Sequence, residues 1–136
     1  MINTRTREIK LIDFGSCTPL QPGKRAKHFY GTKKFASPES LIHETYDPEA
    51  QEVWALGTLL YVLLFKMDPF KTDQDIIDVN IAQKIQRLRI GGYQGNMRGF
   101  DISDHAVSAM LAMLDKDPAQ RIELAQILQL PFFKHY

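Results

Sequence analysis

The chain has 136 residues, of which 44% are hydrophobic and 24% are charged. This length suffices for one domain with a core of its own and is too short for two. The 17 Lys and Arg residues and the 16 Asp and Glu residues give a net charge of +1. Because proteins that bind nucleic acids or membrane surfaces carry a basic excess on one face, we expect neither kind of partner. The single cysteine, Cys17, excludes an internal disulfide, and we expect an intracellular protein of the cytoplasm or the nucleus.

The first predicted element is a short strand over residues 8–12, where polar and apolar side chains alternate before an apolar pair. The strand ends at Asp13-Phe14-Gly15. Residues 16–35 then contain several Pro and Gly residues and lack helical periodicity, which predicts a long loop. Loops of this length are usually functional or disordered. A lone strand needs a partner, and the sequence offers no convincing second strand.

Helices are predicted in the rest of the chain over residues 38–43, 49–65 and 73–88, after the capping residue Ser103, and over residues 123–128. The second of these helices has Asp47 as its cap and Pro48 at its first position, and it is apolar nearly all round. Its apolar run over residues 53–65 is shorter than the about 20 residues that cross a bilayer, so we expect a buried core helix. The sequence therefore predicts a mainly α fold with one short strand.

Five short motifs follow one another along these elements: Asp13-Phe14-Gly15, Gly31-Thr32, Ser37-Pro38-Glu39, Glu52-Val53-Trp54-Ala55-Leu56-Gly57 and Asp117-Pro118-Ala119-Gln120-Arg121. Each motif means little alone, but their order resembles the C-terminal lobe of a eukaryotic Ser/Thr protein kinase. The segment 31–39 is similar to the G-T-x-x-Y-x-A-P-E segment of that family, with Phe in place of Tyr and Ser in place of Ala. Within the family, residues 9–16 and 63–70 resemble the PAS-domain kinases first and the Pim kinases second.

The resemblance implies that residues 1–136 are a partial protein kinase domain. This part comprises the strand before the D-F-G motif, the activation segment 13–39 and a helical large lobe over residues 40–136. The N-lobe and the catalytic loop are absent, because the sequence contains no Gly-rich loop and no H-R-D-x-x-x-x-N motif. The implied function is phosphoryl transfer from ATP, with Mg²⁺, to Ser or Thr of a protein substrate, and the isolated chain is expected to be inactive. The alternative is a non-catalytic, kinase-like binding or decoy module.

The same resemblance assigns roles around the nucleotide. Asp13, Phe14 and Gly15 are expected at the cofactor, with the Asp13 carboxylate as the Mg²⁺ ligand. Phe14 is expected to pack against the core, and Gly15 to let the backbone switch between conformations. Thr32 matches the family position whose hydroxyl lies near the catalytic base. This is a supporting contact only, since the catalytic Asp is not in the chain.

Structural roles are implied for four further residues. Glu39 and Arg121 are expected to form an ion pair that holds the lobe together. Trp54 is expected to pack behind Pro38. Glu52 stands where most kinases have Asp, and it is expected to cap the backbone of the catalytic loop with a side chain that is one methylene longer.

The activation segment departs from the family pattern in its hydroxyl groups. Residues 19–30 contain no Ser or Thr, and the family's usual phosphorylation position is occupied by His28. Kinase loops are commonly ordered by a phosphate that pairs with Arg. We therefore expect the complete kinase to be active without phosphorylation of this loop.

Overall fold

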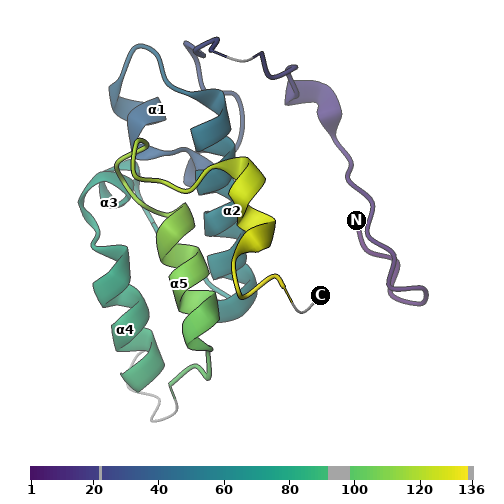
Figure 1. Cartoon of the computed structure of the whole chain (residues 1–136), viewed down its shortest axis with the longest axis vertical. Coiled ribbons are helices and arrows are strands. Elements are labelled where there is room, and N and C mark those ends of the chain that lie inside the picture. Colours follow the sequence, from purple (N-terminus) through teal and green to yellow (C-terminus); the bar gives the residue numbers. More distant parts are fainter. Residues whose placement is uncertain (22, 92–98, 135–136) are drawn as a thin grey trace.

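A computed structural model of the chain describes residues 1–21, 23–91 and 99–134. Figure 1 shows a body of packed helices and an N-terminal arm that runs away from it. The α-helices are α1 Pro38–Ile42, α2 Pro48–Phe65, α3 Asp73–Asp78, α4 Ile81–Gly91 and α5 Asp104–Met113. Three 3-10 helices cover Phe14–Ser16, Lys33–Phe35 and Leu124–Gln129. None of these described helices has the length and apolar character needed to cross a bilayer.

Helix α2 is the centre of the body and begins where the sequence predicts. The Asp47 carboxylate accepts a hydrogen bond of 2.9 Å from the Glu49 amide, and Pro48 occupies the first helical position. The helix ends at Lys66, which adopts a left-handed conformation with φ of 57°. Its buried residues are Gln51, Val53, Trp54, Gly57, Thr58, Leu60, Tyr61 and Phe65. The prediction of a buried core helix is confirmed for this face, whereas Leu56, Leu59 and Leu63 are 40%, 43% and 56% exposed.

Helices α1 and α5 are capped by serines, and the cap at Ser103 is the one that the sequence predicts. Ser37 accepts from the Ser40 amide and Ser103 accepts from the Ala106 amide. Helix α5 packs closely against α2 at Gly57, where an added Cβ would lie only 2.9 Å from the Cβ of Met113. The glycine therefore permits the close approach of the two helices.

Two predicted helices are wrong in detail. The single helix expected over residues 73–88 is divided into α3 and α4 at Val79 and Asn80. The Asn80 side chain accepts a hydrogen bond of 3.1 Å from the Gln83 amide, so it caps the start of α4 and ends the preceding helix. The last predicted helix, over residues 123–128, is a 3-10 helix over Leu124–Gln129.

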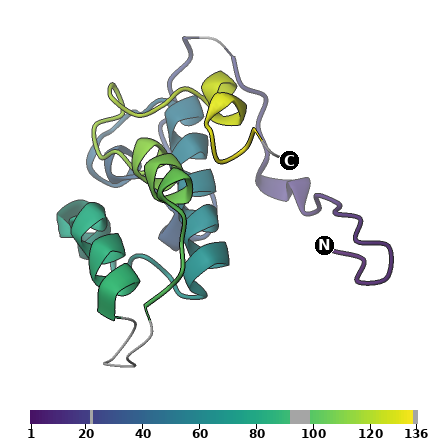
Figure 2. The ribbon, with the colours of Figure 1, turned by 60° about the horizontal axis from the view of Figure 1, so that its bottom comes forward.

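The predicted strand over residues 8–12 is also wrong. Ile9 forms only an isolated antiparallel bridge with Ile2, and no named strand occurs among the described residues. Leu11 is 81% exposed, and every described residue from 1 to 21 is exposed. Figure 2 shows that this arm lies away from the helices, so the segment has no neighbouring strand with which to pair.

Candidate functional site

The end of the activation segment is fixed to α2 by Gln51. The Oε1 atom of Gln51 accepts a hydrogen bond of 2.7 Å from the Ser37 amide, and its Nε2 donates one of 2.9 Å to the Phe35 carbonyl. Gln51 is 3% exposed, and Ala36 and Ser37 are fully buried. Sequence reasoning missed this residue. The sequence does carry one indication of its role: Gln51 is a polar residue on the same face of the helix as Trp54, and the rest of that face is apolar or buried.

An ion pair between Glu39 and Arg121 joins the start of α1 to the loop before the last 3-10 helix. Arg121 Nη1 lies 2.6 Å from Glu39 Oε1, and Nη2 lies 2.9 Å from Oε2, so the pair is bidentate. Arg121 also donates to the carbonyls of Ala50 and Asp115, at 2.8 and 2.9 Å. Both charged side chains are almost fully buried. The contact predicted from the sequence is present, and the guanidinium has backbone acceptors as well as its carboxylate partner.

Trp54 fills the space beneath this ion pair. The indole ring is fully buried and stacks on Phe70, with ring centroids 5.6 Å apart. The Arg121 guanidinium carbon lies 5.1 Å from the centroid of the same ring, within the range of a cation–π contact. Trp54 therefore supports the guanidinium directly. The expected packing behind Pro38 stays a prediction.

Thr32 and the two lysines after it line the exposed side of the segment. Thr32 precedes the 3-10 helix Lys33–Phe35, and its side chain makes no capping hydrogen bond there. Lys33 Nζ lies 3.3 Å from Asp73, and Lys34 Nζ lies 2.9 Å from Asp68. These pairs hold the segment next to α3 with its Thr32 side chain on the exposed surface.

The D-F-G motif lies on the N-terminal arm, apart from the residues described above (Figures 1 and 2). Asp13 has a left-handed backbone with φ of 65° and ψ of 61°, and it precedes the 3-10 helix Phe14–Ser16. The expected packing of Phe14 against the core is wrong for this structure, because its side chain is 63% exposed. The arm that carries Asp13 runs away from the helical body (Figures 1 and 2).

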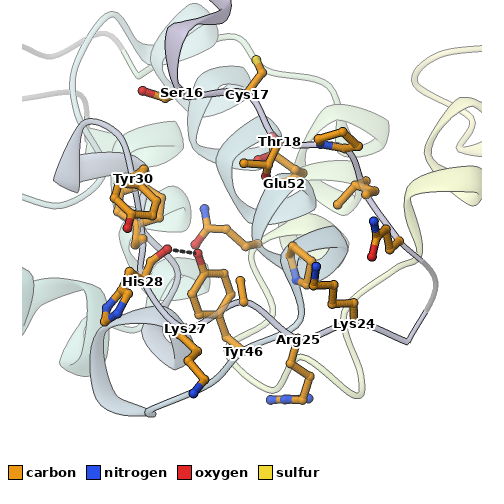
Figure 3. Close-up of a pocket in the computed structure, with 17 residues that line it drawn as sticks. Ser16, Cys17, Thr18, Lys24, Arg25, Lys27, His28, Tyr30, Tyr46 and Glu52 are labelled. Carbon is orange, nitrogen blue, oxygen red and sulfur yellow. Dashed lines mark hydrogen bonds between the residues drawn. The ribbon is translucent and has the colours of Figure 1, made fainter.

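The arm and the loop that follows it border a pocket of about 560 Å³ above the start of α2 (Figure 3). Residues 16–21 and 24–30 line it from the loop, and Tyr46, Pro48, Gln51 and Glu52 line it from the body. Glu52 is exposed and lies near Thr18 in Figure 3. Its carboxylate has no hydrogen-bond partner in the described part of the chain, so the capping role expected for Glu52 stays a prediction.

Asp13 is the residue for which a metal role is expected. Its carboxylate is exposed and offers the oxygen ligands that Mg²⁺ prefers. Within residues 1–21, 23–91 and 99–134, no group of three or more His, Cys, Asp and Glu side chains could hold a metal ion. The role of Asp13 as a Mg²⁺ ligand stays a prediction.

Comparison with known sequences assigns the chain to a family. The family model described as "Protein kinase domain" matches residues 1–133. The chain is 31% identical over 128 residues to calcium-dependent protein kinase 22 of Oryza sativa subsp. japonica, covering 93% of this chain and 21% of that protein. It is 32% identical over 124 residues to the PAS domain-containing serine/threonine-protein kinase of Mus musculus, covering 91% and 8%. It is 33% identical over 132 residues to the serine/threonine-protein kinase pim-2 of Danio rerio, covering 97% and 37%.

The chain belongs to the protein kinase family, and its mainly helical structure with almost no strand is that of a C-terminal lobe. Its curated relatives named above are much longer, and the chain spans 8% to 37% of their lengths. The similar identities to these three kinases do not separate the PAS-domain kinases from the other groups.

Proposed function

We propose that the chain is the C-terminal lobe of a Ser/Thr protein kinase that transfers the γ-phosphate of ATP to Ser or Thr of a protein substrate. The observation that supports this most is the buried, bidentate pair of Glu39 and Arg121, which closes the activation segment onto the helical body. Gln51 fixes the same segment to α2. Ordered backbone at residues 35–39 is what a kinase needs beside the acceptor residue of its substrate, since its catalysis depends mainly on positioning and charge stabilisation.

Within this proposal the residues divide into two groups. Asp13 holds Mg²⁺, which when bound neutralises charge on the ATP phosphates, and Phe14 and Gly15 complete the motif beside the nucleotide. Thr32 supports the catalytic base through its hydroxyl, and Glu52 caps the catalytic-loop backbone. The 136 residues alone have no kinase activity, because they contain neither the catalytic loop nor the Gly-rich loop.

We further propose that the PAS-domain kinases are the nearest subfamily and the Pim kinases the next. The support is the amino-acid sequence of two segments, residues 9–16 and 63–70. A further support is Glu52, which stands where most kinases have Asp. Family membership also suggests an intracellular location, in the cytoplasm or the nucleus.

The proposed function is tested with the full-length protein, purified from its own cells through an affinity tag. We expect it to phosphorylate Ser and Thr, but not Tyr, in a mixed peptide library with ATP and Mg²⁺. The variant Thr32→Ala should lose most of this activity, whereas Thr32→Ser, which keeps the hydroxyl, should retain it. Phosphotyrosine as the product, or equal activity of the two variants, would contradict the proposal.

A second function, as a non-catalytic binding or decoy module, is favoured by one observation. Residues 36–39 are packed against the helical body although the 136 residues contain no catalytic loop. The segment that would face a substrate could therefore bind a partner without any catalysis. The two functions are separated by the DNA upstream of the Met1 codon. A continuous reading frame that encodes H-R-D-x-x-x-x-N and a Gly-rich loop supports the kinase, and a stop codon directly upstream supports the module.

A further inference from the structure

A short stretch of the activation segment is bonded to the turn before α2. Ala26 and Tyr46 form an antiparallel bridge, with each amide 2.9 Å from the carbonyl oxygen of the other residue. Arg25 Nε donates to Thr45 Oγ1 at 3.1 Å, and Arg25 Nη2 donates to the Thr45 carbonyl at 3.0 Å. The Tyr46 hydroxyl donates to the His28 carbonyl at 3.0 Å, as Figure 3 shows. Residues 25–28 are therefore joined to residues 45–46 by backbone and side-chain contacts together.

Tyr46 is the buried member of this contact. It is 5% exposed, whereas residues 25, 27 and 28 are exposed. Burial first, and then the nearby Glu52 carboxylate and Tyr30 phenol, raise the pKa of the Tyr46 hydroxyl. The hydroxyl is consequently protonated near neutral pH and available as a donor to the His28 carbonyl. A buried tyrosine normally needs such a polar partner, and His28 supplies it.

The chemistry of the same stretch leaves little place for a phosphate. Residues 19–30 contain no Ser or Thr. The guanidinium of Arg25, the group best suited to a phosphate, is bonded to Thr45. The charged ends of Arg25 and Lys27 also point away from the Tyr46 ring in Figure 3.

We propose that Tyr46 and Arg25 hold the activation segment in its ordered position by direct hydrogen bonds, in place of a phosphate. Tyr46 is then a positioning residue for phosphoryl transfer, acting through the backbone of residues 26–28. This inference rests on the proposed kinase function. It adds a structural reason for activity without loop phosphorylation, and it names the residues responsible.

Hydrogen exchange of the 136-residue chain, followed by mass spectrometry, tests the contact without any need for activity. In Tyr46→Phe we expect peptides covering residues 25–30 to exchange about two- to tenfold faster, as the loss of one hydrogen bond predicts. Arg25→Met, an exposed substitution that should not impair folding, should have a similar effect. Tyr30→Phe is the matched control, because Tyr30 is 70% exposed and its hydroxyl makes no hydrogen bond within the described residues.

Peptides from α5 report on global unfolding and should exchange at wild-type rates in all three variants. Unchanged exchange of residues 25–30 in both Tyr46→Phe and Arg25→Met would overturn the proposal. Equal acceleration in Tyr30→Phe would overturn it as well, since that variant removes no hydrogen bond of the contact.

The tagged protein purified from cells tests the catalytic consequence. Phosphatase treatment should leave its activity unchanged, and Tyr46→Phe should raise the KM for a peptide substrate severalfold more than it lowers kcat. A large loss of activity that follows one phosphosite between Ser16 and Thr32 would overturn the inference. Exchange effects as expected, in a protein that transfers no phosphate, would contradict the proposed function while leaving the anchoring contact established.

Discussion

Arg121 shows how single residues hold this fold together. Its guanidinium is buried against the Glu39 carboxylate, two backbone carbonyls and the Trp54 ring. A buried ion pair repays the desolvation of its charges only when further hydrogen bonds satisfy both partners. Arg121 meets this condition, but removal of either partner would leave the other charge buried and uncompensated.

We therefore expect Glu39→Gln and Arg121→Met each to lower the free energy of unfolding by about 3–5 kcal/mol. Urea denaturation measures the loss. Lys33→Met is the control, because the Lys33–Asp73 pair is largely exposed and should contribute less than about 1 kcal/mol. A loss below about 1 kcal/mol for both buried variants would show that the pair does not stabilise the lobe.

Gly57 is the second residue with a large expected effect. In Gly57→Ala the new methyl group would lie 2.9 Å from the Cβ of Met113 and the Cγ of Leu114. Overpacking of this kind costs about 1–3 kcal/mol, which exceeds the gain of up to about 1 kcal/mol from the higher helix propensity of Ala. In Gly91→Ala the new methyl group meets no atom of the described residues within 4 Å, and stability should be unchanged or slightly raised. In thermal unfolding, the Tm of Gly57→Ala should fall, whereas the Tm of Gly91→Ala should stay unchanged or rise slightly.

At the scale of elements, α3 depends on a reciprocal cap at its start. The Thr72 hydroxyl accepts from the Asp75 amide, and the Asp75 carboxylate accepts from the amides of Thr72 and Lys71. These bonds, chiefly that from Lys71, hold the pKa of Asp75 below its ordinary value of 3.8. At the far end of the helix, Lys116 donates to the Ile77 carbonyl. The short helix is thus secured at both ends by side chains.

The lowered pKa of Asp75 gives a definite pH dependence. The folded state binds the proton of this carboxyl more weakly than the unfolded state, so the stabilisation is fully present above pH 3.8 and is lost as pH falls through the lower folded value. Backbone amides of α3 should therefore lose hydrogen-exchange protection below pH 3.8. Asp75→Asn should abolish this dependence, whereas the exposed control Asp101→Asn should not. NMR titration of the Asp75 carboxyl above 3.8 would contradict the expectation.

Elements with explicit capping residues were predictable from the sequence. Asp47 and Ser103 each mark the start of a helix within a residue of its observed position. The break before α4 was not predicted, because the apolar spacing continues across it and hides the capping role of Asn80. The prediction of a strand at residues 8–12 was wrong for a different reason. Alternation of polar and apolar residues cannot supply the neighbouring strand with which a strand must pair.

The contacts of the site were predictable where two side chains pair with each other. They were not predictable where a side chain forms a hydrogen bond with backbone groups far away in the sequence. The pair Glu39 and Arg121 was expected from the motif order, and it is present. Gln51 and Tyr46 were missed, because their partners are backbone groups of the activation segment that carry no residue signature. The predicted packing of Phe14 was wrong, because the N-terminal arm does not reach the apolar surface of the helical body, and Phe14 is 63% exposed.

For the whole molecule, the main feature is an uncovered apolar stripe on α2. Leu56, Leu59 and Leu63 lie on one face of the helix and are 40%, 43% and 56% exposed. We expect the 136-residue chain to bind hydrophobic dyes through this stripe and to be sparingly soluble. The variant Leu59→Lys should reduce dye binding, whereas Leu128→Lys, an isolated exposed position on the last 3-10 helix, should not. A soluble monomer that binds no such dye would contradict this expectation.

We propose that this chain supplies the metal-binding and activation segments of a working kinase. The most direct measurement compares transfer of labelled γ-phosphate to a Ser/Thr peptide library by the 136-residue chain, by the tagged protein from its own cells, and by the Asp13→Asn form of that protein. The account predicts turnover of about 1–100 s⁻¹ for the tagged protein, its loss in Asp13→Asn, and none from the isolated chain. Turnover by the isolated chain, activity that survives Asp13→Asn, or no transfer by the tagged protein would contradict it.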